Sequence, residues 1–428
     1  MSTAHGGHPA TRSSGGQEPW TIRPIVPDEL HDFRQVGIEA MLMSATPGPP
    51  PEVWRPLIEP DRTLAAFDGA RIVGTTLTFR FSMTVPGGPR PVAGVSGVGV
   101  LPTHRRRGVL SALMRRQLAD LREHGGEAVA ALFASEGGIY GRFGYGAASS
   151  GVSIRIGRGE GALRADAPRD PALRLRLTTP EDAAKELAVV HEATMRQRPG
   201  TFARDERWWR RILTDPEETR GGFGAHTCVL VEDGAGPLGY ALYRVRPGWD
   251  DYGVAAGELQ VKELYATAPA AYAMLWEHVL QRDLVATVTA DLRPPDDPLY
   301  HLLADYYRAR TVVSDALWIR LVDLPRALEQ RAYSAPVDVV VEVTDTACPW
   351  NAGRWRLSAD PRGAACERTE REPDLRLDVA DLGAAYLGGI RLGALAAAGR
   401  VTEIRDHAVA ELDAALSWPL HPHCGVIF

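Results

Sequence analysis

The sequence lacks the long apolar runs, paired cysteines and basic excess that mark several protein classes. Its longest uncharged apolar run, Val92–Leu101, is much shorter than the about 20 residues that span a bilayer. The formal net charge of -6 gives no electrostatic case for a nucleic-acid partner, although it suits a cationic substrate. Disulfides and a structural zinc site are disfavoured because the four cysteines lie far apart and form no CxxC pair: Cys228, Cys348, Cys366 and Cys424. We therefore expect neither a membrane nor a nucleic-acid partner.

The first 19 residues also lack the apolar core of a secretory signal. They are rich in Gly, Ser, Thr and His, which predicts a disordered leader and a cytoplasmic protein. The composition, 45% hydrophobic and 24% charged, is typical of soluble globular proteins. Because 428 residues are many for one hydrophobic core, we expect two or three domains.

Residues 20–160 alternate short β-branched stretches with helical patterns, which predicts an α/β (α+β) domain. The run AVAALFAS is typical of a buried parallel strand. The preceding strand PVAGVSGVGVLP holds three glycines, which weaken a strand but suit a bulge or the approach of a ligand. A helix between the two strands is predicted by apolar residues that share one face: Leu110, Leu113, Met114, Leu118 and Leu121.

A second region, residues 161–315, repeats this pattern. Its segment VKELYATAPAAYAMLWEHVL has the shape of the earlier VGVLPTHRRRGVLSALMRRQL, an apolar strand followed by a proline and a helix. The second copy has Ala and Tyr where the first has Arg and Gly, so we expect an anion site in the first copy only. Trp208 and Trp209 are interpreted as structural residues of this region. Residues 316–428 form a third segment with strand-like and helix-like stretches.

Three arginines, Arg105, Arg106 and Arg107, stand just before Gly108 and a predicted helix. A helix N-terminus has free N–H groups and a positive dipole end, so this is an unfavourable place for cations alone. A bound pyrophosphate would accept hydrogen bonds from the arginines and offset the repulsion between them. The alternative is that the arginines solvate a surface loop.

The stretch VGVLPTHRRRGVL resembles the coenzyme A-binding signature of the GCN5-related N-acetyltransferases (GNAT), with Leu110 where most members have Gly or Ala. That departure, with PTHRRRG and SEGGIYGRFGYG, resembles the enhanced intracellular survival (Eis) acetyltransferases of actinobacteria over nearly the whole chain. The resemblance implies an active GNAT domain (20–160), a degenerate GNAT-like domain (161–315) and a sterol-carrier-like domain (316–428). It further implies a homohexamer that acetylates aminoglycosides or other polyamine-like acceptors, with acetyl-CoA as co-substrate.

The same resemblance implies the roles of individual residues. Tyr140 is the expected general acid, and the α-carboxylate of Phe428 is the expected general base, carried into the active site by an apolar tail. The acetyl-CoA site is expected to comprise strand, loop and helix residues: Val98, Gly99, Val100, Arg105, Arg106, Arg107, Gly108, Val109, Leu110, Ser111, Ser135 and Glu136. The family places part of its amine pocket in the first helical region, which holds Asp28, Glu29, Asp32 and Glu39, but no single one of these is assigned.

Several alternatives remain open. Tyr140 or its neighbour Tyr145 could only pack in a glycine-rich turn, and the apolar tail could dock for stability alone. We expect no metal at His421, His423 and Cys424, because the ligands are too few and poorly spaced. The acceptor could be a protein lysine instead of an antibiotic. The competing function is a lipid- or protein-binding module with a vestigial acetyltransferase, which the intact motif residues argue against.

Overall fold

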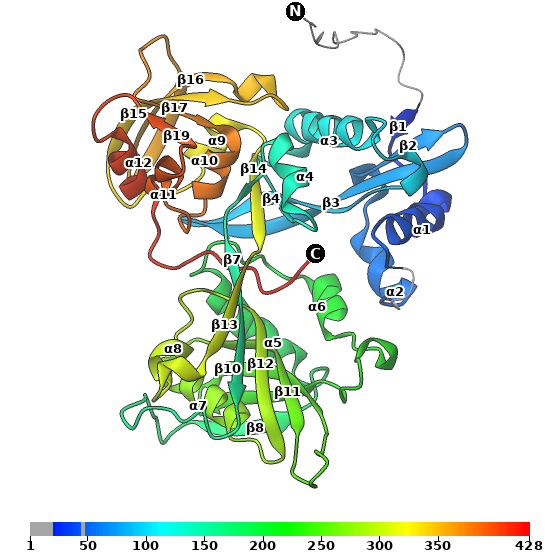
Figure 1. Ribbon diagram of the computed structural model, residues 1–428, viewed down its shortest axis with the longest axis vertical. Helices are drawn as coiled ribbons and strands as arrows, with labels where there is room; N and C mark the ends of the chain where they lie inside the picture. Colours follow the sequence, from blue (N-terminus) through cyan, green and yellow to red (C-terminus); the bar gives the residue numbers. More distant parts are fainter. Residues whose placement is uncertain (1–19, 44–47) are drawn as a thin grey trace, which may run out of the picture.

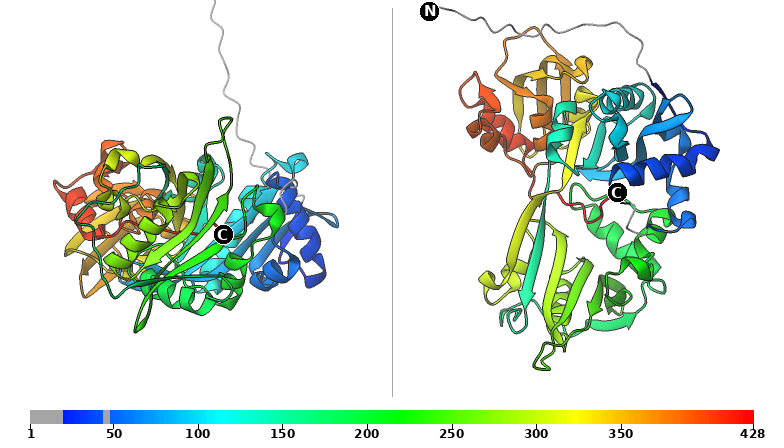
Figure 2. Two further views of the ribbon diagram at one scale, coloured as in Figure 1. Left: turned by 90° about the horizontal axis from the view of Figure 1, so that it is seen from below. Right: turned by 45° about the vertical axis from the view of Figure 1, so that its right-hand side comes forward.

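The structure is a computed structural model, and it describes residues 20–43 and 48–428. The predicted leader, residues 1–19, lies outside the described residues. The described chain forms three bodies, with the first and third domains side by side and the second below them (Figure 1). The C-terminus lies between the first and second domains, and a second view agrees (Figure 2).

The first domain is a mixed sheet with strand order β1-β2-β3-β4-β5-β14-β6. Strands β4 and β5 are parallel, which confirms the parallel strand predicted from the apolar run. The strands are β1 (Thr21–Arg23), β2 (Thr63–Asp68), β3 (Arg71–Val85), β4 (Gly88–Val100), β5 (Val129–Phe133), β6 (Gly146–Ala147) and β14 (Leu317–Leu321). The helices are α1 (Leu30–Ala40), α2 (Pro51–Trp54), α3 (Val109–Asp120) and α4 (Gly137–Tyr140).

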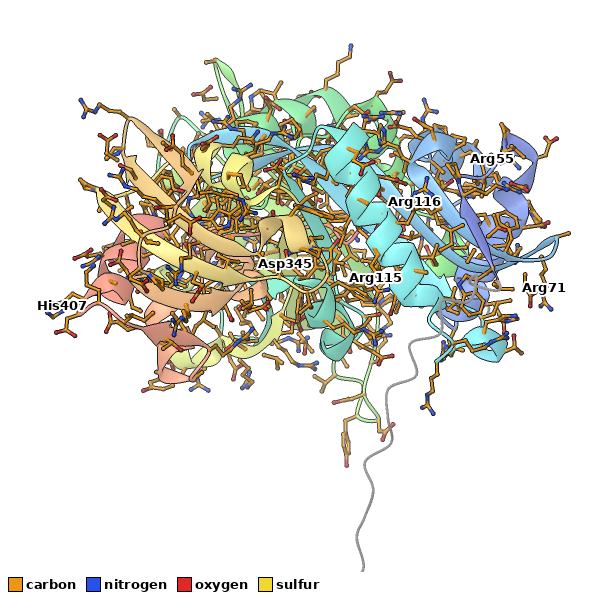
Figure 3. The ribbon with its side chains drawn as sticks, turned by 90° about the horizontal axis from the view of Figure 1, so that it is seen from above. Arg55, Arg71, Arg115, Arg116, Asp345 and His407 are labelled. Carbon is orange, nitrogen blue, oxygen red and sulfur yellow. The ribbon has the colours of Figure 1, made fainter. Side chains whose placement is uncertain are left out.

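Helix α3 forms where the apolar spacing predicts it, and it packs on β2, β3 and β4. Leu113, Met114 and Leu118 are fully buried on its inner face. Figure 3 shows the opposite face along the surface of the domain, where Arg115 and Arg116 are exposed. A single π-type turn continues the helix to Gly125, and Gly126 follows in the left-handed conformation.

The second domain is a similar sheet of order β13-β7-β12-β11-β10-β9-β8. The parallel pair β11 and β12, connected by α7, repeats the β4-α3-β5 arrangement, as the internal repeat predicts. The strands are β7 (Ser150–Gly157), β8 (Arg174–Thr178), β9 (Thr227–Asp233), β10 (Gly236–Arg246), β11 (Gly257–Ala266), β12 (Val285–Arg293) and β13 (Arg310–Asp315). The helices are α5 (Ala184–Met195), α6 (Glu206–Leu213), α7 (Pro269–Leu280) and α8 (Leu299–Leu302).

The third domain is a sheet of order β17-β16-β15-β18-β19 with helices packed on it. Its core is filled by buried aliphatic side chains such as Val339, Leu357, Leu375 and Leu412. The strands are β15 (Val337–Thr344), β16 (Gly353–Asp360), β17 (Gly363–Arg368), β18 (Leu375–Asp378) and β19 (Val401–Glu403). The helices are α9 (Leu324–Glu329), α10 (Val379–Ala385), α11 (Leu392–Ala397) and α12 (Ala408–Leu416).

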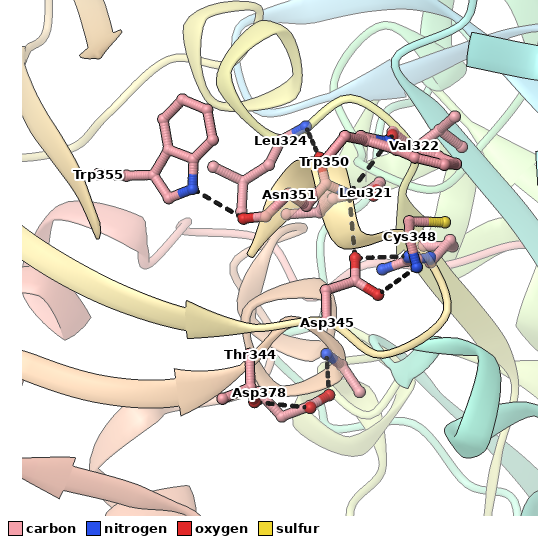
Figure 4. A network of polar contacts seen from close by, with 12 residues as sticks. Leu321, Val322, Leu324, Thr344, Asp345, Cys348, Trp350, Asn351, Trp355 and Asp378 are labelled. Atoms are coloured by element: carbon pink, nitrogen blue, oxygen red, sulfur yellow. Dashed lines mark hydrogen bonds and ion pairs between the residues drawn. The ribbon is translucent and has the colours of Figure 1, made fainter. Parts of the chain in front are cut away.

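The chain crosses twice between the first two sheets. It leaves the first sheet after β6 and enters the second at β7, and it returns through β13 into β14, which pairs with β5. A buried ion pair then joins β14 to the third domain, because Arg320 donates to Asp345 at 2.6 Å and both side chains are inaccessible. Asp345 also accepts hydrogen bonds from the Cys348 N–H and the Asn351 amide (Figure 4). The first and third domains are therefore one packed unit.

No helix in residues 20–43 and 48–428 combines the length and the apolar character needed to cross a bilayer.

Candidate active site

Strand β4 contains the bulge that its glycines predict. Thr75 on β3 pairs with Gly99, whereas Leu77 pairs with Ser96, so β4 has an extra residue at this point. Gly97 has a φ of +59°, which strains any residue with a side chain, and its carbonyl accepts from the Thr75 hydroxyl at 2.8 Å. The bulge lies directly before Val98, Gly99 and Val100, the residues expected to bind the pantetheine arm.

Strands β4 and β5 part just before the bulge. Their parallel register covers Val92–Gly94 against Val129–Ala131 and then ends. The remainder of β4 still pairs with β3 on its other edge. A strand that has lost one neighbour leaves backbone donors and acceptors free on that edge, and an extended amide-bearing ligand can bind them. This edge fits the pantetheine arm of coenzyme A.

The loop from β4 to α3 presents further backbone donors. Gly108, with a φ of +87°, is the N-cap of α3, and the first helical hydrogen bond runs from the Ala112 N–H to the Gly108 carbonyl at 3.0 Å. The N–H groups of Val109, Leu110 and Ser111 therefore have no partner within the helix. The Val109 side chain is buried in the core and cannot contact a ligand. The groups of this turn that can hold a pyrophosphate are therefore its free backbone N–H groups.

Two of the three arginines make contacts within the protein. Arg105 donates to the carbonyl of Ala40 at 2.9 Å, at the C-terminal end of α1, where a cation is favourable. The guanidinium of Arg107 lies 5.5 Å from the centroid of the Trp20 ring. Arg106 has the left-handed φ of +60° and an exposed side chain. These contacts hold the loop in shape, which is a role that the sequence pattern did not indicate.

Strand β5 leads directly into the turn that carries the expected acid. Ser135 and Glu136 are exposed, and the Glu136 carbonyl accepts from the N–H of Ile139 as α4 begins. Tyr140 ends α4 and is 5% exposed. Burial raises the pKa of the Tyr140 phenol, and a hydrogen bond with Ser135 partly offsets that rise. The phenol is therefore protonated at neutral pH and can donate a proton.

Tyr145 lies deeper and faces Tyr140, with ring centroids 6.1 Å apart in an edge-to-face arrangement. It is fully buried, and among the described residues its hydroxyl has no hydrogen-bond partner. Burial raises its pKa strongly, despite the nearby Arg320. Tyr145 therefore packs beneath Tyr140, which agrees with the packing alternative for this residue.

The C-terminal tail ends among aromatic residues of the first two domains. The ring of Phe428 lies 4.7 Å from that of Phe81 on β3, 5.5 Å from Phe133 on β5 and 6.0 Å from Phe202. Among the described residues, no basic nitrogen lies within 4.0 Å of the Phe428 carboxylate. The chain end therefore lies near Phe133, the last residue of β5, which precedes Tyr140 by seven positions, and no ion pair with a described residue neutralises its charge.

The second domain holds the tail upstream of Phe428. The His423 N–H donates to the Pro199 carbonyl at 2.8 Å, and the Thr201 hydroxyl donates to the His423 carbonyl at 3.1 Å. Arg198 bridges Asp296, at 2.6 Å, and the carbonyl of His421, at 2.7 Å. The second domain thus helps to position the terminal residues.

Trp208, which the sequence suggested was only structural, belongs to this aromatic cluster. Its ring lies 5.2 Å from Phe81 and 5.3 Å from Phe202. A tryptophan pair in a helix carries no local sign that it meets residues more than 100 positions away. The described residues contain no group of three or more His, Cys, Asp or Glu side chains arranged to hold a metal ion.

Family comparisons agree with these three domains. Residues 21–148 and residues 200–321 each match an acetyltransferase (GNAT) domain family, and residues 324–425 match the sterol carrier protein domain. An uncharacterized N-acetyltransferase of Streptomyces coelicolor is 46% identical over 365 residues, 84% of this chain and 88% of that protein. The N-acetyltransferase Eis of Mycobacterium tuberculosis is 36% identical over 378 residues, 85% of this chain and 89% of that protein.

Solved structures lead to the same family. Eis1 from Mycobacterium abscessus has a TM-score of 0.80 at 35% identity, covering 95% of this chain and all of that one. The fold and the site thus define a tandem GNAT acetyltransferase with a sterol-carrier-like third domain, which confirms the predicted architecture. The chain belongs to the Eis family of N-acetyltransferases, and enzymes with GNAT domains use acetyl-CoA as co-substrate.

Proposed function

We propose that this enzyme acetylates primary amines of small polyamine-like acceptors, such as aminoglycosides, with a lysine side chain as a second acceptor class. The proposal rests on the position of Phe428. The last residue of the chain lies against Phe81 and Phe133, on the two strands that flank the start of the diverging edge of β4. A bulky side chain and a carboxylate are thereby held next to the expected thioester.

In the proposed mechanism, acetyl-CoA supplies the acetyl group as an activated thioester. The Phe428 carboxylate accepts a proton from the attacking amine, directly or through water, as the C–N bond forms. The Tyr140 phenol, kept protonated by burial, donates a proton to the sulfur as the C–S bond breaks. The two substrates bind together, so orientation supplies much of the acceleration.

The residues expected around the co-substrate keep the roles proposed for them. The β4 edge at Val98–Val100 binds the pantetheine arm, and the N–H groups from Gly108 to Ser111 bind the pyrophosphate with support from Arg106. Ser135 and Glu136 border the thioester, at the turn that carries Tyr140. We further propose that the enzyme is cytoplasmic and that it forms a homohexamer. Sedimentation of the purified protein measures the oligomeric state directly.

A thiol-release assay with acetyl-CoA and a panel of aminoglycosides and lysine peptides tests this function. Turnover of at least one amine supports it, whereas tight coenzyme A binding without turnover of any amine contradicts it. Coenzyme A should also raise the melting temperature, because a ligand specific to the native state stabilises that state.

A further inference from the structure

A cavity of about 490 Å³ lies on the second domain beside the C-terminal tail. One wall consists of Gly425, Val426 and Ile427, and the next residue is Phe428. Since consecutive Cα atoms are about 3.8 Å apart, the cavity begins close to the terminal carboxylate. Its volume falls in the range typical of small-molecule sites.

Cationic side chains dominate the opposite wall. Arg211 on α6, Arg244 on β10 and Lys262 on β11 all line the cavity. Within the described part of the chain, neither Arg211 nor Lys262 forms an ion pair. Arg244 donates to the Gln260 amide oxygen at 2.8 Å and lies 4.9 Å from the centroid of the Phe223 ring, and no carboxylate among the described residues forms an ion pair with it. Three positive groups thus share one small space.

The lowered pKa of Lys262 agrees with this excess of positive charge, whereas the lowered pKa of Arg211 reflects burial alone. Burial lowers the pKa of Arg211. Burial also lowers the pKa of Lys262, and the nearby Arg244 and Arg211 lower it further against the opposing effect of Glu263. Such like charges repel one another, and the repulsion is relieved when an anion binds between them.

Carboxylates of the cavity compensate this charge only in part. Asp215 already accepts from the His226 N–H at 3.0 Å and lies 3.1 Å from the Arg220 guanidinium. Asp291, which is exposed, is the other acidic residue of the lining. Glu263 points to the far side of β11, where Arg204 binds it at 2.8 Å.

The tail supplies an apolar surface to the same cavity. Ile427 is 57% exposed although it is the penultimate residue of a docked segment. Leu292 and Val426 extend this surface. A ligand with an anionic group and a short aliphatic body matches both walls, because the aliphatic part covers Ile427 while the anion faces the cations.

We propose that this cavity binds the anionic group, a carboxylate or a phosphate, of a small amine acceptor. The inference rests on the proposed acetyltransferase function and adds a further class, amines that carry an anionic group, to the polyamine-like acceptors proposed above. The amine reaches the Phe428 carboxylate, and the anionic end accepts charge-assisted hydrogen bonds from Arg211 and Lys262. A polycation of the same length brings a positive group against these side chains instead.

Three amines of matched length test the proposal: hexylamine, 1,6-diaminohexane and 6-aminohexanoate. We expect the wild-type kcat/KM for 6-aminohexanoate to exceed that for hexylamine at least about tenfold, a typical effect of a hydrogen bond to a charged group. Arg211→Gln and Lys262→Gln should each reduce this ratio severalfold and leave hexylamine turnover unchanged.

The control Arg282→Gln removes an exposed arginine of the same domain and should keep the ratio. Equal turnover of all three amines by the wild type overturns the proposal, as does a ratio retained in Arg211→Gln.

Calorimetric titration with 6-aminohexanoate separates this inference from the proposed function. Binding to the wild type that is lost in Arg211→Gln supports the cavity even if no amine is acetylated, whereas no binding overturns it. Inorganic phosphate distinguishes the source of the anion. If the anion belongs to the acceptor, phosphate competes with 6-aminohexanoate and leaves hexylamine turnover unchanged. If phosphate stimulates hexylamine turnover, the cavity takes a free anion and the acceptor assignment is wrong.

Discussion

Phe428 and Phe81 meet edge to face, with ring centroids 4.7 Å apart and planes inclined by 71°. One is the last residue of the chain and the other is in the central part of β3. This contact connects the sheet of the active GNAT domain to a tail that the second domain holds through Thr201 and Arg198. The first and second domains therefore both hold the chain end.

Tyr140 and Tyr145 form a matched pair for testing the general acid. Tyr140→Phe should lower kcat by about 10²- to 10⁴-fold, the usual contribution of a positioned acid, while coenzyme A binding stays unchanged. Tyr145→Phe removes a buried hydroxyl without a partner among the described residues, so it should keep activity and full stability. Equal losses in the two variants would argue against the assignment of Tyr140.

Gly94 provides room for Phe81 beneath the chain end. A Cβ at this position would lie 2.1 Å from the Phe81 ring, so the ring that supports Phe428 must move. We expect Gly94→Ala to destabilise the protein by about 1–3 kcal/mol and to lower kcat, since overpacking displaces side chains. Gly234→Ala is the control, because a Cβ there meets no atom within 4 Å. Denaturant unfolding measures the loss of stability, and steady-state kinetics measure the loss of kcat. A fully active Gly94→Ala enzyme would contradict the view that the Phe81 ring positions Phe428 for catalysis.

The ion pair between Arg320 and Asp345 should be essential for joining the first and third domains. Asp345→Ala leaves the guanidinium buried without a carboxylate, and we expect a loss of about 3–5 kcal/mol. Asp338→Ala breaks an exposed pair with Arg356 and should cost less than about 1 kcal/mol. Urea titrations of the two variants give the comparison. Similar midpoints would show that the buried pair does not hold the domains together.

Local patterns were sufficient to predict the parts of the fold built from neighbouring residues. The apolar spacing of Leu113, Met114 and Leu118 predicted α3, and the three glycines of β4 predicted a bulge or the approach of a ligand, of which the structure shows the bulge. The insertion of β14 beside β5 was not predicted, because strand pairing across nearly 190 residues leaves no local pattern in either strand. The role of Trp208 was missed for the same reason.

The arginine motif shows the limit of sequence reasoning within the site. The motif predicted an anion site at the start of α3, and the free N–H groups of Val109 to Ser111 fit that site. The contacts of Arg105 with Ala40 and of Arg107 with Trp20 depend on α1 and on the residue that precedes β1, both of which lie against the loop. Only the tertiary structure distinguishes side chains that hold the loop from donors that face the ligand.

The terminal carboxylate is tested most directly by moving it. Two glycines added after Phe428 shift the α-carboxylate by up to about 7 Å and keep the aromatic ring in place. Measurement of kcat for this variant in the thiol-release assay, with coenzyme A affinity determined alongside, isolates the carboxylate from the fold. We predict a loss of about 10²-fold or more in kcat with unchanged coenzyme A affinity, as expected when a general base is displaced. An extended enzyme with the kcat of the wild type would contradict the account.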